Sequence, residues 1–379
     1  MTTMIPAPSN VPELIVPPRL LLGPGPSTVD PRILRAQSTP LLGHLDPWFV
    51  ELMDHTQELL RYAFQTKNRL TIPISGTGSA AMEAAVANMV EPGDGVLVCA
   101  SGYFGLRLAD MAQRYGGNVK IITCPWGQVF SGEEVSKELQ NHPSKVVCIV
   151  HAETSTGAKQ PLDQIISVVH AAGAIVIVDA VTSLGGIPLF VDQQDIDVCY
   201  SGSQKCLSCP PGMSPITLGE RAVEKLAARK TTVPNWYLDL KVVQQYWGKE
   251  RTYHHTAPIS NVYGFYEALR IVAEEGLENR WQRHRKNAMF FWDGLSEIGL
   301  SCHVEEKYRL ESLTTVRVPG SIEEPHVRSR LLNEYNIEVG GGLGELKGKV
   351  WRVGLMGYSS RKENITLLLA ALREILENN

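Results

Sequence analysis

Short apolar runs alternate with helical patterns through the first half of the chain, and this alternation limits the folds open to it. LTIPI (70–74), GVLVCA (95–100), KVVCIVHA (145–152) and AIVIVDA (174–180) are typical of strands, and a helical pattern follows each of the first three. Because these runs lack polar alternation, both faces of each strand should be buried. Helices between such strands supply the crossover connections of a parallel sheet. The pattern therefore predicts an α/β fold with a parallel sheet covered on both sides.

The pattern changes after about residue 261. A long helical tract, FYEALRIVAEEGLENRWQRHRKNAMFFWDGL (265–295), comes first. Two shorter strands with polar alternation follow, LTTVRVP (313–319) and KVWRVGL (349–355), and the last segment, ENITLLLAALREILE (363–377), is helical in pattern. This second region is therefore predicted to be a smaller α+β domain.

The 379 residues allow two or three domains at roughly 150 residues each. Four prolines in residues 1–17 exclude a helix there, so we expect an extended N-terminal arm. We expect a large domain over residues 18–275 and a small domain over residues 276–379.

Charge and cysteine content argue against several classes of protein. The chain has 36 Lys and Arg against 40 Asp and Glu, a net charge of −4, which gives no support to nucleic-acid binding. Its seven cysteines include one C-x-x-C pair, Cys206 and Cys209, without the second pair of a structural zinc site. We expect reduced thiols and no metal. Without a signal peptide or a long apolar run, the sequence predicts a cytoplasmic protein.

GTGSAA (76–81) lies between a predicted strand and a predicted helix and fits a variant of the dinucleotide-binding fingerprint. That fingerprint requires an acidic residue at the end of the next strand, where this chain has VLVCASGYFG. The assignment of the chain as a nucleotide-dependent oxidoreductase would depend on this motif alone. The simpler interpretation is that the helix start and the Thr77 and Ser79 hydroxyls bind a phosphate. The alternative is a tight turn that needs glycine.

Asp179 and Lys205 form the most informative pair. Asp179 ends a buried strand, and Lys205 ends the next strand-like segment, DVCYSGSQK (197–205). A lysine amine can condense with an aldehyde cofactor, and a carboxylate on a neighbouring strand can keep a pyridine nitrogen protonated. Taken singly, Asp179 could instead cap a following helix, and Lys205 could be a solvated surface lysine.

Arg352 lies inside the apolar strand KVWRVGL, so its guanidinium needs an anion. The fork of N–H donors suits the carboxylate of a ligand, and an internal Asp or Glu is the alternative. Tyr253-His254-His255-Thr256 is a compact polar segment. Adjacent histidines in a strand point to opposite sides, which makes this pair a poor metal site.

Eight motifs together resemble the fold-type I pyridoxal-phosphate (PLP) enzymes of the class V aminotransferase family, and most closely its alanine–glyoxylate and serine–pyruvate aminotransferases. The motifs cover nearly the whole chain in family order: LLGPGPS (21–27), ISGTGSAAMEAA (74–85), HAETSTG (151–157), VDAVTSLGG (178–186), YSGSQKCLSCPPG (200–212), YHHTAP (253–258), GLEN (276–279) and GGLG-x(6)-WRVGLMG (341–357). The resemblance implies a large domain with a mostly parallel seven-stranded sheet and a smaller C-terminal α+β domain.

The resemblance also implies roles for individual residues around the cofactor. Lys205 would attach covalently to PLP and move the substrate proton, and Asp179 would pair with the ring nitrogen. Phe104 would stack on the ring, where close relatives often have Trp. The residues expected to hold the phosphate are Thr77, Gly78, Ser79 and Gln204, although animal relatives have His in place of Ser79. Thr154 would lie beside the 3′-oxygen of the ring.

Further roles concern the substrate and a second chain. Arg352 would bind the substrate α-carboxylate, and Gly25 would line a small acceptor pocket. Tyr253 and Thr256 would reach the cofactor phosphate of the partner subunit, which implies a homodimer. The resemblance implies no catalytic role for Cys206 or Cys209.

The implied activity is a ping-pong transamination from alanine or serine to glyoxylate or pyruvate. A related class V transaminase would use another donor, namely aspartate, 2-aminoethylphosphonate or 3-hydroxykynurenine. A non-catalytic regulator with the same fold would need a DNA-binding module, and the chain has no basic stretch to supply one.

Overall fold

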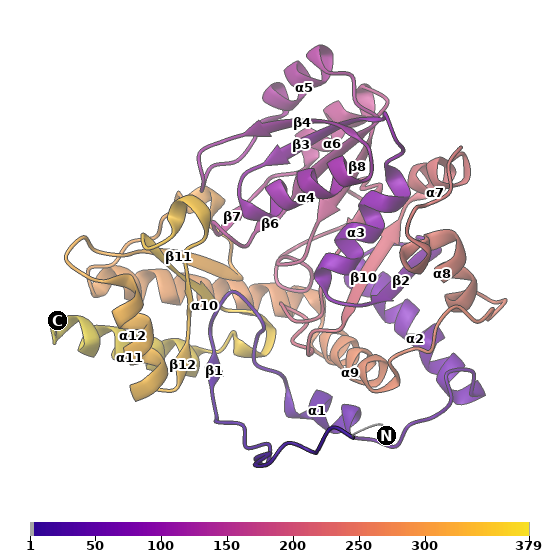
Figure 1. The fold of residues 1–379 in the computed structure, drawn as a ribbon. Coiled ribbons are helices and arrows are strands. Elements are labelled where there is room, and N and C mark those ends of the chain that lie inside the picture. The colour runs from indigo at the N-terminus through magenta and orange to yellow at the C-terminus, as the bar shows by residue number, and fades with distance from the viewer. Residues whose placement is uncertain (1–3, 379) are drawn as a thin grey trace.

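The computed structural model describes residues 4–378. Its centre is a seven-stranded sheet in the order β2-β10-β9-β8-β5-β3-β4 (Figure 1). The strands are β2 (Leu70–Ser75), β3 (Gly95–Ala100), β4 (Asn118–Thr123), β5 (Val146–Val150), β8 (Ile175–Asp179), β9 (Val198–Tyr200) and β10 (Met213–Leu218). Only β10 runs antiparallel to its neighbours, β2 and β9. The predicted mostly parallel seven-stranded sheet is confirmed.

Helices cover both faces of this sheet (Figure 1). Every residue of β5 and β8 is buried, as expected for strands enclosed on two sides. The helices of this part are α1 (Pro31–Gln37), α2 (Pro47–Phe64), α3 (Gly78–Met89), α4 (Tyr103–Arg114), α5 (Gly132–Asn141), α6 (Asp163–Ala171), α7 (Glu220–Ala227), α8 (Leu240–Trp247) and α9 (Ile259–Glu275). A short hairpin, β6 (Ala152–Glu153) and β7 (Ala158–Lys159), follows β5.

The long helical tract predicted over 265–295 is wrong as one helix. It is divided between α9 and α10 (Leu277–Glu297) at Gly276, whose φ of +79° lies outside the helical region. Glycine reaches this left-handed region at no steric cost, so the chain ends one helix there and begins the next.

The C-terminal part has a second core around an antiparallel sheet in the order β11-β14-β13. Its further elements are β11 (Leu313–Arg317), α11 (Glu324–Glu334), β12 (Ile337–Glu338), β13 (Gly340–Gly341), β14 (Val350–Gly354) and α12 (Lys362–Glu377). Apolar side chains from α10, α12 and β14 pack together here, among them Phe291, Trp351 and Leu368. The mixture of helices and antiparallel strands agrees with the predicted α+β character.

The start of the chain lies against this second core. β1 (Leu20–Leu21) pairs in parallel with β12 (Figure 1). Leu22 is buried in the C-terminal apolar cluster. The division at residue 275 stays a prediction, and β1 lies with the C-terminal part although it precedes that residue. Residues 4–17 form neither helix nor strand and are exposed; residues 1–3 of the expected arm lie outside the described residues. No helix within residues 4–378 is both long and apolar enough to span a membrane.

Candidate active site

Asp179 ends β8 and is almost fully buried, with 2% of its surface exposed. Its Oδ1 accepts a hydrogen bond of 2.8 Å from the Val181 N–H, and its Oδ2 accepts one of 2.8 Å from the Tyr200 hydroxyl. Burial raises its pKa to about 6, although both hydrogen bonds and the charge of Lys205 act in the opposite direction. Turns rather than a helix follow Asp179, so the helix-cap alternative is wrong.

Lys205 does not end a strand as predicted. β9 stops at Tyr200, and Lys205 lies five residues later in an irregular loop. The side chain is nevertheless buried, and its Nζ donates a hydrogen bond to the Pro24 carbonyl. Burial, followed by the positive charge of Arg352, lowers its pKa to about 8. The solvated-lysine alternative is therefore wrong.

The pairing of β8 with β9 brings Asp179 and the Lys205 loop to the same edge of the sheet. Asp179 lies opposite Tyr200 in the register of the two strands, and the loop to Lys205 begins at the next residue. The Ser27 hydroxyl donates to the Lys205 carbonyl at 2.8 Å and so holds the loop from outside the sheet. This is the carboxyl edge of parallel strands, where α/β proteins place their ligands.

Gly25 packs directly against the Lys205 side chain. A Cβ atom at this position would lie 2.7 Å from Lys205 Cδ and 2.8 Å from Nζ, and the φ of Gly25 is +110°. Both the backbone conformation and the lack of space require glycine here. The approach to Lys205 is thus narrowed by the 24–27 segment, consistent with the expected small pocket.

The start of α3 lies beside the same loop. A Cβ on Gly78 would contact Val181 at 3.5 Å and Gly202 at 3.7 Å, so the helix start is close to both strand ends. Thr77 precedes the helix with an exposed side chain that makes no capping hydrogen bond. Gln204 Oε1 is buried and has no hydrogen-bond partner among the described residues. Free amide, hydroxyl and helix-start N–H groups are suited to a phosphate.

Ser79 has a partner that sequence reasoning did not identify. Its hydroxyl accepts a hydrogen bond of 3.2 Å from Arg107 on α4. The same guanidinium lies 4.8 Å from the centre of the Phe104 ring. Arg107 therefore connects the expected phosphate end with the expected stacking residue, and only its position three residues after Phe104 could have indicated this.

Glu153 is a second buried carboxylate that sequence reasoning left without a role. It accepts hydrogen bonds from the Ser155 hydroxyl at 2.6 Å and from the Gly105 N–H at 3.3 Å, and its own pKa is raised by burial. The carboxylate thus supports the first turn of α4, which carries the half-buried Phe104. Its place in HAETSTG was the available signal.

Arg352 lies in the middle of β14 and faces the first part of the chain. Its Nε donates to the Gly341 carbonyl at 2.7 Å, and its NH1 donates to the Thr154 carbonyl at 3.3 Å. No carboxylate in residues 4–378 forms an ion pair with it, so the internal-partner alternative is wrong. Burial lowers its pKa to about 10, while the charge of Glu153 acts to raise it. An unpaired, mostly buried guanidinium is prepared for an anionic ligand.

Thr154 is buried next to this arginine, and its hydroxyl shares a hydrogen bond with that of Thr182, three residues after Asp179. The loops after β5 and β8 are thus joined where the ring of a ligand held by Asp179 and Lys205 would lie.

Tyr253 and Thr256 are exposed, with their hydroxyl oxygens 3.5 Å apart. Within the described chain, neither hydroxyl has a hydrogen bond to Lys205 or to the start of α3. His255, between them, contacts the Ser75 hydroxyl through Nε2 at 3.0 Å. This segment is thus beside the end of β2 but directs its two hydroxyls outward.

Cys206 and Cys209 are buried unpaired thiols, and burial raises their pKa to about 11 and about 12. Within residues 4–378 no three His, Cys, Asp or Glu side chains are grouped to hold a metal ion.

The residues of this edge fit PLP. The N–H groups at the start of α3 and the free Thr77 hydroxyl provide donors for its phosphate end, and buried Asp179 lacks the cation that a protonated ring nitrogen would supply. Lys205 lies in the loop after β9, at the same edge of the sheet as Asp179. A ligand with an anionic end and a cationic ring would satisfy both.

Comparisons with known proteins agree with this geometry. The family model described as "Aminotransferase class-V" matches residues 36–365. The alanine–glyoxylate aminotransferase of Rattus norvegicus is 40% identical over 99% of this chain and 92% of its own length. The (S)-ureidoglycine–glyoxylate transaminase of Bacillus subtilis is 41% identical over 96% of this chain and 92% of its own. A crystal structure of an alanine–glyoxylate aminotransferase from Nostoc sp. superposes with a TM-score of 0.96 and 56% identity, covering 97% of this chain and 98% of that one.

Proposed function

The chain belongs to the class V aminotransferase family, and we propose that it transfers the amino group of alanine to glyoxylate. It is a PLP-dependent enzyme. The observation that carries the proposal is the buried pair of Lys205 and Asp179 at the carboxyl edge of the sheet, with Arg352 opposite and without a carboxylate partner. The choice of substrates follows the Nostoc protein, which is 56% identical.

PLP, when bound, supplies an aldehyde that condenses with amines and a protonated ring that withdraws electrons. Asp179 would hold the proton on the ring nitrogen, because its buried carboxylate would gain the positive partner that it otherwise lacks. Lys205 Nζ would be the amine that attaches the cofactor, and as a free amine it would be the base that moves the proton of the substrate Cα. Its pKa of about 8 lets the same amine accept and return a proton near neutral pH.

The other residues bind and orient. Thr77, Gly78, Ser79 and Gln204 would hold the phosphate, Phe104 would stack on the ring, and Thr154 would lie beside its 3′-oxygen. Arg352 would bind the substrate α-carboxylate through the N–H donors that it does not use on main-chain carbonyls. Gly25 would line the acceptor pocket, and its lack of a side chain lets the 24–27 segment pack against Lys205.

A second donor has support of its own. The Bacillus subtilis relative is a ureidoglycine–glyoxylate transaminase and is as similar in sequence as the rat enzyme, so (S)-ureidoglycine is the second candidate donor. Glyoxylate is the acceptor named for both proteins. Aspartate has weaker support, since the aspartate aminotransferase of Thermus thermophilus is 31% identical, and no observation favours 2-aminoethylphosphonate or 3-hydroxykynurenine.

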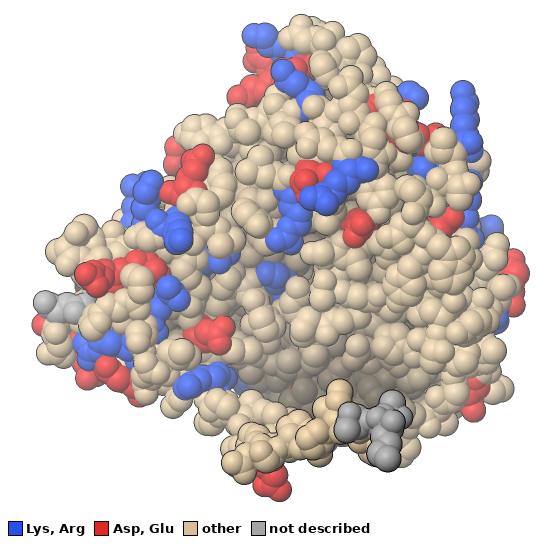
Figure 2. Space-filling view, viewed as in Figure 1, with Lys and Arg blue, Asp and Glu red and all other residues tan. Residues whose placement is uncertain are grey.

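The proposed enzyme is a homodimer. Large apolar side chains are exposed on three neighbouring segments. These side chains are Leu41, Leu42, Leu45, Trp48, Trp236, Tyr237 and Tyr253. The His44–Tyr253 ring contact at 5.3 Å joins the first segment to the third, and the stacking of Trp236 on His254 at 4.2 Å joins the second to the third. Figure 2 shows few charged side chains over the neighbouring helices α2, α8 and α9. A contiguous apolar surface of this kind is typical of a protein interface, and covering it would place Tyr253 and Thr256 against a partner.

We also place the enzyme in the cytoplasm, because all seven cysteines are unpaired and five of them are buried.

The experiment that tests the function combines a spectrum with a substrate panel. The purified protein should show a visible absorption band that borohydride removes and that is absent in Lys205→Ala. Lys159→Ala, which removes a lysine paired with Glu311 outside the site, should keep the band. Single half-reactions with alanine, serine, (S)-ureidoglycine and aspartate should be fastest with alanine. A colourless protein, or a band that survives in Lys205→Ala, contradicts the proposal.

A further inference from the structure

Arg280 is a fully buried arginine in the first turns of α10, with 3% of its surface exposed. Its Nε donates to the Gly185 carbonyl at 3.0 Å, and its NH2 donates to the Cys206 carbonyl at 2.5 Å. Its NH1 is paired with Glu275 Oε2 at 2.6 Å. All three nitrogens of the guanidinium are thus used, two of them on main-chain carbonyls.

The two carbonyls belong to the segments that carry the proposed catalytic pair. Cys206 is the residue after Lys205, and Gly185 lies in the series of turns that follows Asp179. The two segments are in contact, since a Cβ on Gly185 would lie 3.1 Å from Leu207. Arg280 therefore joins the Lys205 loop to the turns after β8 from the side opposite the Ser27 hydroxyl.

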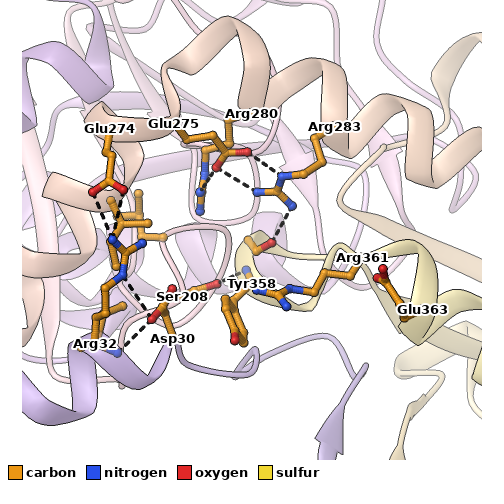
Figure 3. Close-up of a pocket in the computed structure, with 14 residues that line it drawn as sticks. Asp30, Arg32, Ser208, Glu274, Glu275, Arg280, Arg283, Tyr358, Arg361 and Glu363 are labelled. Atoms are coloured by element: carbon orange, nitrogen blue, oxygen red, sulfur yellow. Dashed lines mark hydrogen bonds and ion pairs between the residues drawn. The ribbon is translucent and has the colours of Figure 1, made fainter.

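Glu275 connects this arginine to the loop after β14. It also binds Arg283 through Nε at 2.5 Å, and Arg283 NH1 donates to the carbonyls of Gly357 at 2.9 Å and Ser360 at 2.7 Å. Figure 3 shows Glu275 between the two arginines beside a cavity of about 480 Å³. Burial acts to raise the pKa of Glu275, but its two arginine partners outweigh it and lower the pKa to about 2.

Uncharged side chains also connect the loop after β14 with α10 and with the Lys205 loop. His284 Nδ1 donates to the Arg280 carbonyl at 2.8 Å, and its Nε2 accepts the Gly357 N–H at 2.8 Å. The Ser208 hydroxyl accepts the Tyr358 N–H at 2.7 Å. The loop that leaves Arg352 on β14 is thus linked to the Lys205 loop both directly and through α10.

We propose that Arg280, held by Glu275, is a positioning residue that sets Lys205 and Asp179 relative to Arg352. The proposal rests on the proposed function. A charged side chain is costly to bury when only main-chain carbonyls and one carboxylate repay its lost hydration. Here one carbonyl belongs to the residue after Lys205 and the other to the turns after Asp179. Lys205 would act on the substrate carbon whose carboxylate Arg352 binds, and Asp179 would hold the ring attached to it. Small displacements between such groups reduce the rate strongly.

The test compares Arg280→Gln with Arg280→Lys. Arg280→Gln should lower kcat about 10- to 100-fold, with a smaller change in KM for alanine. It should also move the pH at which the visible band titrates by about half a unit or more, because the surroundings of the Lys205 amine change. Arg280→Lys keeps the charge and should recover part of both. Arg270→Gln, which breaks only exposed ion pairs on α9, is the matched control and should match the wild type.

The outcomes separate the two proposals. If Arg280→Gln lowers the urea midpoint while kcat and the band titration of the folded enzyme stay at wild-type values, Arg280 is only structural and the inference fails. If Arg280→Gln does not fold, Glu275→Gln keeps the arginine and should shift both readouts in the same direction by less; no shift there also overturns the inference. A wild-type protein without the band fails the proposed function instead.

Discussion

Four ionisable side chains at the site are buried, and burial shifts the pKa of each in the direction that favours its uncharged form. It raises the pKa of Asp179 and Glu153 and lowers that of Lys205 and Arg352. Without a ligand these groups cost stability, because water solvates their charges better than the protein interior does. In the proposed enzyme, PLP would supply a positive charge to Asp179 and the substrate a carboxylate to Arg352, so ligand binding would repay part of this cost.

Asp179 makes this cost measurable. Its pKa of about 6 in the folded chain exceeds the ordinary value of 3.8, so folding favours the protonated acid. The stabilisation of the folded state by the protonated acid is fully present below the pKa of Asp179 in the unfolded chain. It is lost as the pH rises through the pKa in the folded chain, and the loss is about 3 kcal/mol by pH 7. Cofactor-free Asp179→Asn should therefore gain up to this amount over the wild type between pH 4 and pH 7, measured by urea unfolding.

The control for this substitution is another buried aspartate of the same sheet. Asp197 is paired with Arg221 at 2.6 Å and accepts the Val176 N–H at 2.8 Å, so Asp197→Asn should lose stability at pH 7. The effects on activity with PLP bound are the opposite of those on stability. Asp179→Asn should lower kcat about 100-fold or more, and Asp197→Asn should not. The quantity to compare is the free energy of unfolding of Asp179→Asn minus that of the wild type. If this difference is no larger at pH 7 than at pH 4, the raised pKa assigned to Asp179 is wrong.

Among the elements, β9 differs most from its prediction. DVCYSGSQK was predicted as one strand, yet only Val198–Tyr200 is a strand, and beyond it the Ser201 and Ser203 N–H groups donate to β10 alone, at the Pro215 and Met213 carbonyls. The Ser201 hydroxyl bonds to the Ala180 carbonyl at 2.9 Å, and Gly202 lies against the start of α3. The chain thus leaves the sheet early, and this departure lets Lys205 turn back toward Asp179.

Gly276 separates α9 from α10 and gives an element-level prediction. A Cβ there would touch only Asn279 at 3.6 Å, so Gly276→Ala tests backbone conformation without a clash. We expect a loss of about 1 kcal/mol in the free energy of unfolding, because alanine is strained at a φ of +79°. Gly320→Ala, at an open position without a positive φ, should change it little. Equal urea midpoints for the two variants would show that the break does not depend on glycine.

At the scale of the whole molecule, the proposed site needs two chains. Tyr253 and Thr256 direct their hydroxyls outward, beside apolar side chains that a second copy would cover. Two variants test this: the single substitution Lys205→Ala, and the double substitution Tyr253→Phe with Thr256→Ala. Each should be poorly active as a homodimer. In a hybrid dimer, one site receives Lys205 from one chain and both hydroxyls from the other.

Mixing and refolding the two variants should therefore give more activity than the sum of the separate proteins. Activity equal to that sum, or a protein that sedimentation shows to be a monomer, would contradict the shared site. A mixture of Lys205→Ala with Asp179→Asn is the matched control. Lys205 and Asp179 of one site come from the same chain, so each site of this hybrid dimer still lacks one of them. This mixture should therefore stay inactive.

Much of the fold could be predicted from the sequence because it depends on local patterns. The apolar runs became β2, β3, β5 and β8, and the family motifs predicted the seven-stranded sheet. The errors were at positions where tertiary contacts or a single backbone conformation override local preference: the short β9 and the break at Gly276. The pairing of β1 with the C-terminal part was not predicted. Arg107, Glu153 and Arg280 were missed because a charged residue has no periodic pattern that reveals its partner.

The sequence by itself determined the fold class, the family and the identity of Lys205, Asp179 and Arg352 as the groups with chemistry to offer. Those properties depend on residue type, order and spacing. Only the tertiary structure decided that Asp179 and Lys205 are buried at one edge, that Arg352 has no carboxylate partner in residues 4–378, and that Arg280 joins the segments around them. Burial and pairing depend on what the rest of the chain places nearby, and that arrangement shifts the pKa values on which the proposed chemistry depends.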